Sequence, residues 1–538
     1  MLADAASVLF LILALVRWFA GVPAALPPLV PLLAAAALAA VPRWRSARSG
    51  RWPRPHPETV LCLALALLYR TSALVHPWGW VNRDGAYGAF VTLHLLAGER
   101  PAPVFTEGGN YQGTLKPHLA AVLALLTGER DLSRLMAAAS LLLSLVFVGA
   151  SMALARRVGG RWAGAAAGLY LALGPRFPTV FTLNCVGQYA DVLALGGLAL
   201  ALLARLLDED AGGRQARGAH FALGLLLGAA FWQQPVALAY ALAAGTALLL
   251  RRRTWRDPWA LAVPAGALVG ALPVLLWNLQ NGWGSGEILG REAGDVRAQA
   301  QALPEAIART FTVSFPILGG LSPGHPWAGL APVGWLAAAV IPCALAAYVA
   351  LRRRELAASL RGPGAGSALL APLLMLASLA LFWSVAAGRV HWRPRYLLPV
   401  VAATAVHLGV AVGAAARRSR LLAGAVLAPL LALNAAGFLP RLREAAEAQR
   451  HHRGLVRALE ATGIRTGYAD FSIAAPVTMF TAERILLSPR LGPTPAYYSP
   501  SQEARVAAAG PDAFVLRPRD DAEEFARALR GLGVSFQF

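Results

Sequence analysis

The sequence is poor in the residues from which many catalytic and metal sites are built. Only 14% of its 538 residues are charged, and only three are cysteine. Cys62, Cys185 and Cys343 lie far apart, in or beside apolar runs. This spacing excludes a zinc motif and a disulfide framework. The sequence also lacks a P-loop and any Ser/His/Asp arrangement typical of a hydrolase. Its function therefore does not depend on these common kinds of site.

Lysine is almost absent from this basic chain. Lys116 is the only lysine among 49 basic residues, and all the others are arginine. Lysine carries a compact point charge that arginine does not reproduce, and phosphate binding is one use of that charge. The isolated lysine therefore predicts a phosphate-binding role for Lys116. The alternative is the chance survival of one lysine codon in a GC-rich gene.

Long apolar segments dominate the composition. Hydrophobic residues make up 57% of the chain, and the mean hydropathy is +0.52. Apolar runs of about 20 residues separated by short arginine clusters predict transmembrane helices. We therefore expect a polytopic α-helical membrane protein with about 13 spans. The predicted spans cover residues 4–22, 24–41, 58–76, 131–154, 162–175, 189–207, 218–232, 235–250, 259–277, 329–351, 366–386, 395–415 and 420–438.

The arginine clusters predict the orientation of the spans. They lie at 43–54, 156–161, 214–217, 251–256, 352–354 and 417–420, which fall on one side of the membrane if the spans alternate. The positive-inside rule places that side, and the N-terminus, in the cytoplasm. The first segment is predicted to be a retained span, not a signal peptide. The net charge of +21 is thus explained by arginines that set the membrane topology and contact anionic lipid headgroups. No nucleic-acid partner is expected. The predicted location is a bacterial cytoplasmic (inner) membrane.

Three regions follow from this topology. Residues 1–57 hold two spans and a basic cytoplasmic loop, and residues 58–438 form the core with outer loops at 77–130 and 278–328. Residues 439–538 are predicted to form a small extracytoplasmic α/β domain. Its strands and helices alternate, which favours a parallel or mixed sheet. The predicted elements are a helix at 441–462, a strand at 467–471, a helix at 472–481, strands at 485–487 and 513–516, a helix at 520–532 and a strand at 534–538.

Two acidic residues at the outer edge are candidate catalytic groups. Asp84 follows two tryptophans just past a span, where a carboxylate could act as a general base on an acceptor hydroxyl. The alternative is a solvated loop carboxylate. Asp191 begins the sixth predicted span, and an ionisable residue at a membrane edge is a site candidate. The alternative is an acidic residue favoured by the helix dipole.

Arginines on the outer side are the second group of candidates. Arg393 and Arg395 precede the twelfth span, where positive-inside disfavours them. A phosphate ligand or lipid headgroups would explain both. Arg70 lies near the outer end of the third span. Its side chain either reaches the lipid headgroups or faces the same cavity as the other candidate residues of the outer side.

These residues together resemble the GT-C-type membrane glycosyltransferases, which include lipid A aminoarabinose transferases and protein O-mannosyltransferases. The resemblance spans roughly residues 58–415. Asp84 resembles the acid of the family's first outer loop, and Asp191 a second acid. Tyr111 and Lys116-Pro117 resemble the Tyr and Lys-Pro that contact the donor phosphate. The segment Arg395–Pro399 resembles the Arg-Tyr-Leu-Leu-Pro entry to a late span.

The resemblance implies transfer of one sugar from a polyprenyl-phosphate donor to a lipid, glycan or protein acceptor. Lys116, helped by Arg395 or Arg393, would stabilise charge on the departing phosphate. Asp84 would take the acceptor proton, giving inversion at the sugar carbon, and Asp191 would position acceptor or sugar. No cofactor is certain, although two acids and a phosphate could hold a divalent cation.

Three other functions remain open from the sequence. A transporter or lipid flippase would show paired charges or broken helices near the membrane midplane. A scaffold or sensor would act through the outer α/β domain, and loss of Asp84 would not change its function. An outer-face polymer ligase with a diphosphate-linked donor would rely on His391 and Arg393 more than on Lys116.

Overall fold

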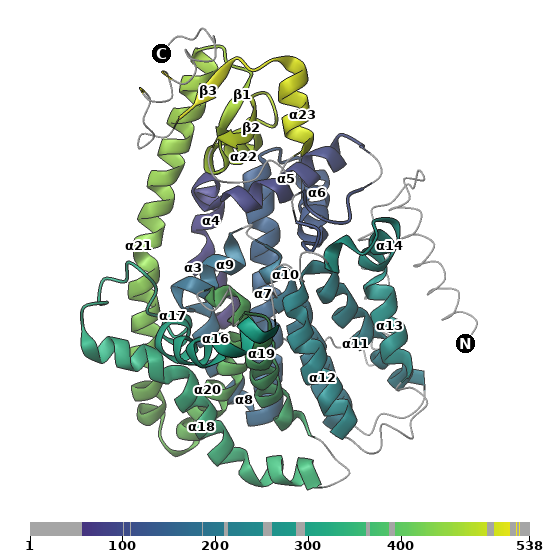
Figure 1. The fold of residues 1–538 in the computed structure, drawn as a ribbon. Helices are drawn as coiled ribbons and strands as arrows, with labels where there is room; N and C mark the ends of the chain where they lie inside the picture. The colour runs from purple at the N-terminus through teal and green to yellow at the C-terminus, as the bar shows by residue number, and fades with distance from the viewer. Residues whose placement is uncertain are drawn as a thin grey trace.

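The fold is a bundle of helices with a small sheet at one end (Figure 1). The structure is a computed structural model. It describes residues 56–99, 102–107, 109–184, 187–208, 214–250, 261–286, 296–361, 366–386, 393–491 and 500–516, together with 523 and 527. The polytopic helical class with a small α/β part is confirmed. The two spans predicted at 4–22 and 24–41 lie outside the described residues.

Within the described residues, seven helical stretches are long and apolar enough to cross a membrane, or eight if one bent pair counts as a span. The number thirteen is therefore not confirmed. The seven are carried by α3 (Pro57–Arg70), α7 (Leu132–Gly159), α10 (Tyr189–Asp208), α18 (Ala331–Arg361), α19 (Leu370–Ala386), α20 (Leu398–Arg418) and α21 (Arg420–Ala461).

Four predicted spans correspond to shorter, less apolar or bent helices. They are α8 (Arg161–Ala172), α11 (Arg214–Gln233), α12 (Leu238–Leu250) and the pair α13 (Ala262–Gly270) and α14 (Leu272–Gln280). The 12 residues of α8 rise about 18 Å, less than the ~30 Å apolar layer. The α13–α14 pair bends by 59°. Pro273 explains this break, because proline lacks the N–H that would continue the helix.

Small residues let the helices of the bundle approach closely. Gly224 and Gly228 of α11 face Gly266 and Gly270 of α13, and a Cβ atom at any of them would come within 1.9–2.3 Å of a backbone oxygen. This spacing of small residues four apart is a common basis of close packing between membrane helices. Alanine at these positions would therefore push the two helices apart.

The ends of the long helices sort into two groups. Arg157 pairs with Asp208 (2.7 Å), Arg417 donates to the carbonyl of Gly159 (3.1 Å), and Arg156 lies 3.5 Å from Glu58. The basic turns after α7 and α20, the start of α3 and the end of α10 therefore meet at one end of the bundle. The opposite ends of α10 and α20, which begin near Tyr189 and Pro394, point away from the basic turns. This arrangement agrees with the alternation expected from the arginine clusters.

The segment 77–130, predicted to be an outer loop, contains two helices. They are α5 (Arg83–Leu96) and α6 (Leu115–Thr127), which follow the short α4 (Ser72–Val75) and a 3-10 turn at Pro77–Trp80. The later segment 278–328 contains α16 (Val296–Arg309), a π-turn at Thr310–Ser314 and α17 (Phe315–Leu318). A short helix, α9 (Arg176–Leu183), connects α8 with the loop before α10.

The C-terminal part is a three-stranded parallel sheet with order β2-β1-β3. The predicted strands and first short helix are confirmed as β1 (Thr466–Asp470), α22 (Phe471–Phe480), β2 (Leu486–Leu491) and β3 (Ala513–Val515). The helix α23 (Pro500–Ala509) was not predicted. The predicted elements at 520–532 and 534–538 lie outside the described residues, apart from positions 523 and 527.

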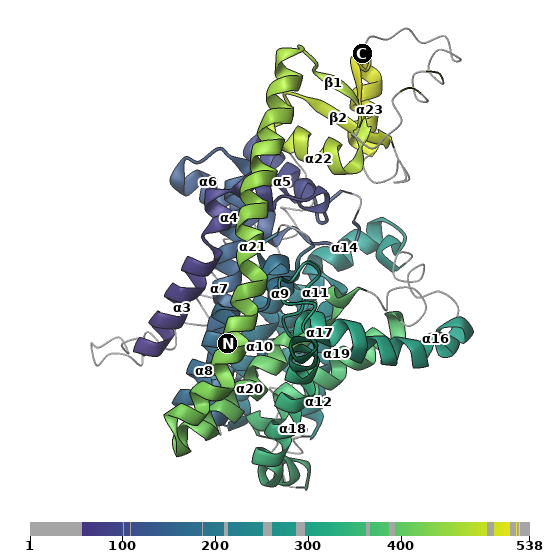
Figure 2. The same cartoon turned by 90° about the vertical axis from the view of Figure 1, so that its left-hand side faces the viewer.

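One expectation about this part is wrong. The span predicted at 420–438 and the helix predicted at 441–462 form a single helix, α21, of 42 residues. Pro429 and Pro440 lie inside it, and both are accommodated without ending the helix. Figure 2 shows α21 running along the bundle to the sheet. The sheet therefore stands on a membrane helix and not on a linker.

Candidate functional site

A buried ion pair joins the lone lysine to one of the candidate acids. Lys116 lies in the first turn of α6 and Asp191 in the first turn of α10, and both side chains are 0% exposed. The Lys116 Nζ lies 3.5 Å from Asp191 Oδ2 and donates to the carbonyl oxygen of Gly187 at 3.1 Å. The structure therefore brings together two residues that the sequence singled out separately.

This pair is incompletely satisfied. Neither carboxylate oxygen of Asp191 accepts a hydrogen bond, and the ammonium of Lys116 has three donors for these two contacts. Removing each ion from water costs several kcal/mol, so a loose buried pair is a poor source of stability. Strained electrostatics of this kind are concentrated at functional sites. The pair has a donor to spare for an anionic ligand.

Backbone contacts of the loop before α6 set the position of Lys116. The N–H of Gly113 donates to the carbonyl of Gln233 at 3.0 Å, and the N–H of Leu115 donates to Gln233 Oε1 at 3.0 Å. A Cβ atom at Gly113 would lie 2.6 Å from the carbonyl oxygen of Trp232. Glycine is therefore required for this close approach, which anchors the loop just before Lys116 to the end of α11.

Two glutamines beside the pair were missed by the sequence interpretation. Gln233 is 0% exposed with its Nε2 unpartnered, and Gln234 is 4% exposed with its Oε1 unpartnered. Gln234 Oε1 lies 3.6 Å from the place where a Cβ of Gly187 would be. The sequence feature that could have identified them is the Gln-Gln pair between two apolar runs. We call Lys116, Asp191, Gly187, Gln233 and Gln234 the polar cluster.

Arg395 lies in a second group of polar side chains near the start of α10. Its guanidinium is stacked 5.2 Å from the ring centroid of Tyr396, and its Nε is buried without a partner. Tyr189, two residues before Asp191, and Tyr111 are both within electrostatic range of Arg395. The candidate phosphate-binding residues Tyr111 and Arg395 are thus placed near each other, at the same end of the bundle as the polar cluster.

Arg393 precedes the 3-10 turn Pro394–Leu397 and is half-buried. It has an interaction of its own, so it is not a free cation. His391, which the alternative ligase function would use, lies outside the described residues. Arg393 therefore stays a candidate phosphate-binding residue.

The contacts observed around Asp84 do not include the Lys116–Asp191 ion pair. It occupies the first turn of α5, where Asn82 caps the helix by accepting from the N–H of Gly85 at 2.8 Å. The side chain is 23% exposed, and its charged neighbour is Arg83, 3.8 Å away. The structure does not bring Asp84 into contact with Lys116 or Asp191. A partly exposed carboxylate remains accessible to an incoming acceptor.

Both expectations for Arg70 are wrong. Arg70 is 3% exposed, and its guanidinium donates to the carbonyl oxygens of Leu171 and Ala172, each at 2.7 Å. These are among the last carbonyls of α8, which the helix itself leaves unpaired. Arg70 therefore caps the end of the short helix α8, and it neither reaches the headgroups nor faces the polar cluster.

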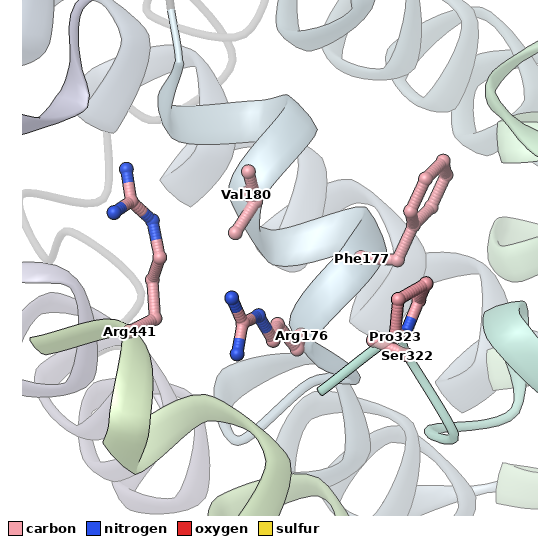
Figure 3. Close-up of a pocket in the computed structure, with 6 residues that line it drawn as sticks. All are labelled: Arg176, Phe177, Val180, Ser322, Pro323 and Arg441. Atoms are coloured by element: carbon pink, nitrogen blue, oxygen red, sulfur yellow. The ribbon is translucent and has the colours of Figure 1, made fainter. Parts of the chain in front are cut away.

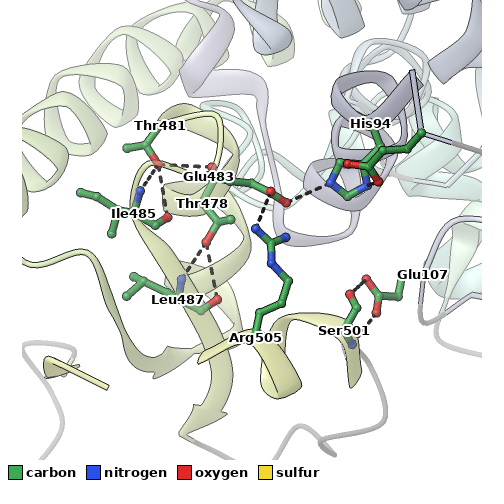
Figure 4. Close-up of polar contacts among 10 residues, drawn as sticks. His94, Glu107, Thr478, Thr481, Glu483, Ile485, Leu487, Ser501 and Arg505 are labelled. Carbon is green, nitrogen blue, oxygen red and sulfur yellow. Dashed lines mark hydrogen bonds and ion pairs between the residues drawn. The ribbon is translucent and has the colours of Figure 1, made fainter. Parts of the chain in front are cut away.

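The C-terminal sheet packs over α5, the helix that carries Asp84. Glu483 is hydrogen-bonded to His94 Nε2 at 3.1 Å and accepts from Arg505 at 2.8 Å (Figure 4). Glu483 has a φ of 62°, which is strained for a residue other than glycine and fixes its direction. The hydrogen bond raises the pKa of His94, and His94 and Arg505 hold the pKa of Glu483 at about 2.

A second contact ties the same parts together. Glu107, in the loop before α6, accepts from the backbone N–H (3.0 Å) and the hydroxyl (2.8 Å) of Ser501. We call these interactions, with the His94–Glu483–Arg505 contacts, the domain latch. The latch and the stack of Tyr87 on Phe471 hold the sheet domain over α5. In the described part of the chain, no three His, Cys, Asp or Glu residues are grouped to hold a metal ion.

Residues 113–277 match the family model described as dolichyl-phosphate-mannose-protein mannosyltransferase. This region contains Lys116, Asp191 and both glutamines of the polar cluster. The comparison with curated proteins found no match.

The fold is similar to that of ArnT from Cupriavidus metallidurans. The crystal structure bound to undecaprenyl phosphate has a TM-score of 0.53 and 17% identity, covering 89% of this chain and 95% of that chain. The apo structure gives the same TM-score and identity, with 86% and 94% covered. The oligosaccharyltransferase of Archaeoglobus fulgidus has a TM-score of 0.47 and 12% identity, covering 79% of this chain and 61% of that chain. The family match over residues 113–277 and the fold similarity to ArnT bear out the predicted resemblance, as a likeness of part of the sequence and of the fold.

Proposed function

We propose that this GT-C-type protein is an inverting glycosyltransferase that uses a polyprenyl-phosphate-linked sugar as donor. The acceptor would be a lipid, glycan or protein on the outer face of a bacterial cytoplasmic membrane. The observation that carries the proposal is the under-satisfied ion pair of Lys116 and Asp191 inside the polar cluster. The C-terminal sheet domain would lie outside the cytoplasm, above the site.

The phosphate of the donor would bind at Lys116. The leaving group carries increasing negative charge as the bond between sugar and phosphate breaks, and a fixed ammonium in a dry site stabilises that charge strongly. The Gly187 carbonyl accepts from one of the three donors of Lys116, and Asp191 lies beside the ammonium at 3.5 Å, so at least one donor is left for a phosphate oxygen. Arg395 and Tyr111 would complete the phosphate site, and Arg393 is a further candidate.

The two acids would have different roles. Asp84 is partly exposed and would take the proton from the acceptor hydroxyl as that oxygen attacks the sugar carbon. Attack opposite the departing phosphate inverts the configuration at that carbon. Asp191 is fully buried and would hold Lys116 in place and orient the sugar or the acceptor. The separate locations of the two acids suit this division.

A reconstituted transfer assay tests the proposal. Purified protein in liposomes is given a panel of radiolabelled polyprenyl-phosphate sugars and native membrane lipid extract. We expect one donor to be consumed, and transfer to be lost in Asp84→Asn and Lys116→Met. A matched variant, Glu99→Gln, changes an exposed acid near the end of α5 and should keep activity. Transfer that survives Asp84→Asn refutes the proposed base.

Transport is the second candidate function, and two observations favour it. A buried charge pair and the bend between α13 and α14 are features that transporters use. The pair, however, lies at the start of α10 and not at its middle. A flippase would move a polyprenyl-phosphate sugar between leaflets without releasing it. Movement of intact donor with no sugar transfer would favour this function over the transferase.

A further inference from the structure

A cavity lies at the other end of α9 from the polar cluster. It has a volume of about 220 Å³ and lies between α9, the start of the loop 319–330 and α21. Figure 3 shows the lining side chains, which are Arg176, Phe177, Val180, Ser322, Pro323 and Arg441. Two guanidinium groups thus line one small cavity together with apolar side chains.

The charges around this cavity do not balance. Arg176 pairs with Glu444 at 2.6 Å, and Arg441 lies 3.8 Å from the same carboxylate. Arg441 is held in place because it donates to the carbonyl of Gly79 at 2.7 Å and stacks 4.6 Å from the Trp80 ring. Two cations share one carboxylate, so the lining keeps an excess of one positive charge.

The cavity also contains unpartnered donors. Arg176 Nη1 and the hydroxyl of Ser322 are buried without a hydrogen-bond partner, and Ser322 is only 4% exposed. A buried donor left unpaired costs about 1–3 kcal/mol, and more when it is charged. The forked guanidinium of arginine matches the geometry of phosphate oxygens. A cavity with excess positive charge and two spare donors is therefore suited to a phosphate group.

The surroundings favour a phosphate attached to an apolar chain. Phe177 and Val180 form an apolar wall beside the arginines. Leu439, two residues before Arg441, is 57% exposed, and Trp327, in the loop that carries Ser322, is 39% exposed. An inorganic phosphate would leave these apolar surfaces unused, whereas a lipid chain would cover them.

We propose that the cavity of Arg176, Ser322 and Arg441 binds the phosphate headgroup of a second lipid, separate from the donor. Its assignment as the acceptor rests on the proposed function. The eight residues of α9 rise about 12 Å, and the loop after them leads to Gly187 of the polar cluster. A headgroup held at the start of α9 would therefore lie near the reacting sugar without competing for Lys116.

Binding is measured with dodecyl phosphate, a phosphate monoester with an apolar tail, by thermal shift titration in a neutral detergent. Wild type should bind dodecyl phosphate at least about tenfold more tightly than inorganic phosphate. Arg176→Gln should weaken dodecyl phosphate binding about tenfold or more, and Ser322→Ala severalfold. Ser322→Ala removes one hydroxyl and keeps the ion pairs, so it still tests the cavity if Arg176→Gln folds poorly.

Two control variants test whether dodecyl phosphate binds in this cavity. Arg309→Gln also breaks an arginine–glutamate pair, with Glu305 at 2.8 Å, and should leave binding unchanged. The double variant Lys116→Met/Asp191→Leu removes the phosphate site proposed for the donor, which would itself bind a phosphate on an apolar tail. Dodecyl phosphate should still bind to this double variant, and adding Arg176→Gln or Ser322→Ala should weaken that remaining binding. Loss of all binding in the double variant, or no weakening by either added substitution, overturns the proposal. Equal affinity for inorganic phosphate overturns the lipid part. The test needs no sugar transfer, so failure of the proposed function would be seen separately.

Discussion

The ion pair of Lys116 and Asp191 allows structural and chemical roles to be separated by a double-mutant cycle. Lys116→Met keeps most of the side-chain length and removes the charge. It leaves the Asp191 carboxylate fully buried without a cation, since neither oxygen accepts a hydrogen bond in the structure. Removing one partner of a buried pair costs about 3–5 kcal/mol. We expect the apparent free energy of unfolding to fall by that amount in Lys116→Met, and similarly in Asp191→Leu.

The double variant Lys116→Met/Asp191→Leu should be close to wild type in stability. Apolar side chains of similar volume can replace a buried ion pair with a neutral or favourable effect. The coupling energy between the two sites would then be about 6–10 kcal/mol in magnitude, well above the usual range of about 0.5–3 kcal/mol for residues in contact. Sugar transfer should nevertheless stay absent, because the ammonium that stabilises the departing phosphate is gone.

Chemical unfolding in detergent, run beside the transfer assay, measures both quantities. Arg134→Met is the control, because Arg134 is 47% exposed and pairs with Glu129 at 2.6 Å. An exposed pair of this kind contributes about 0–1 kcal/mol. A Lys116→Met protein as stable as this control would contradict a charged, buried pair. Restored transfer in the double variant would contradict the role of Lys116 in the reaction.

Three further predictions test other parts of the molecule. Asp84→Asn should lower the transfer rate by about 10²–10⁴-fold with unfolding unchanged, because the carboxylate is partly exposed; a smaller effect would remove it as the base. Gly113→Ala should weaken donor binding, since its Cβ would meet the Trp232 carbonyl at 2.6 Å and displace the loop before α6; an unaltered affinity would show that the loop does not position the site. The domain latch should be strongest between about pH 4.5 and 6.5. The pKa of His94 is raised, so its contribution to the stability of the latch is complete below pH 6.5 and is lost as the pH rises through the folded-state pKa. The pKa of Glu483 is lowered from 4.5 to about 2, so its contribution to the stability of the latch is complete above pH 4.5 and is lost as the pH falls toward 2. Hydrogen exchange of α22 against pH measures this, and a profile in His94→Ala identical to wild type would refute it.

The sequence predicted the fold class well because apolar length and arginine clusters depend on local composition. The spans at 58–76, 131–154 and 189–207 correspond to observed helices, and the basic turns meet at one end as expected. Helix breaks were harder to predict. Tertiary packing, and not composition, keeps α21 helical through Pro440 and lets Arg70 cap the short α8.

The candidate site was predictable one residue at a time but not as an arrangement. Lys116 was identified by its rarity and Asp191 by its place at a membrane edge, yet their contact depends on how α6 and α10 both pack on α7. Gln233 and Gln234 were missed because glutamine at a span boundary is common, and their burial depends on the loop that covers them. Asp84 was predicted as a base at the outer edge, and its charged neighbour in the structure, Arg83, is the adjacent residue of the chain.

The continuous helix α21 has a consequence for the distance between the sheet domain and the site. Its 42 residues rise about 63 Å as one continuous helix, so the length of the helix sets the height and rotation of the domain. One inserted residue near its end would raise the domain by about 1.5 Å and turn it by about 100°, which would separate His94 from Glu483. Seven inserted residues would raise it by about 10 Å and nearly restore its rotation. The space between the domain and the site, and with it the size of acceptor that the proposed transferase could take, would then depend on the number of helical turns in α21.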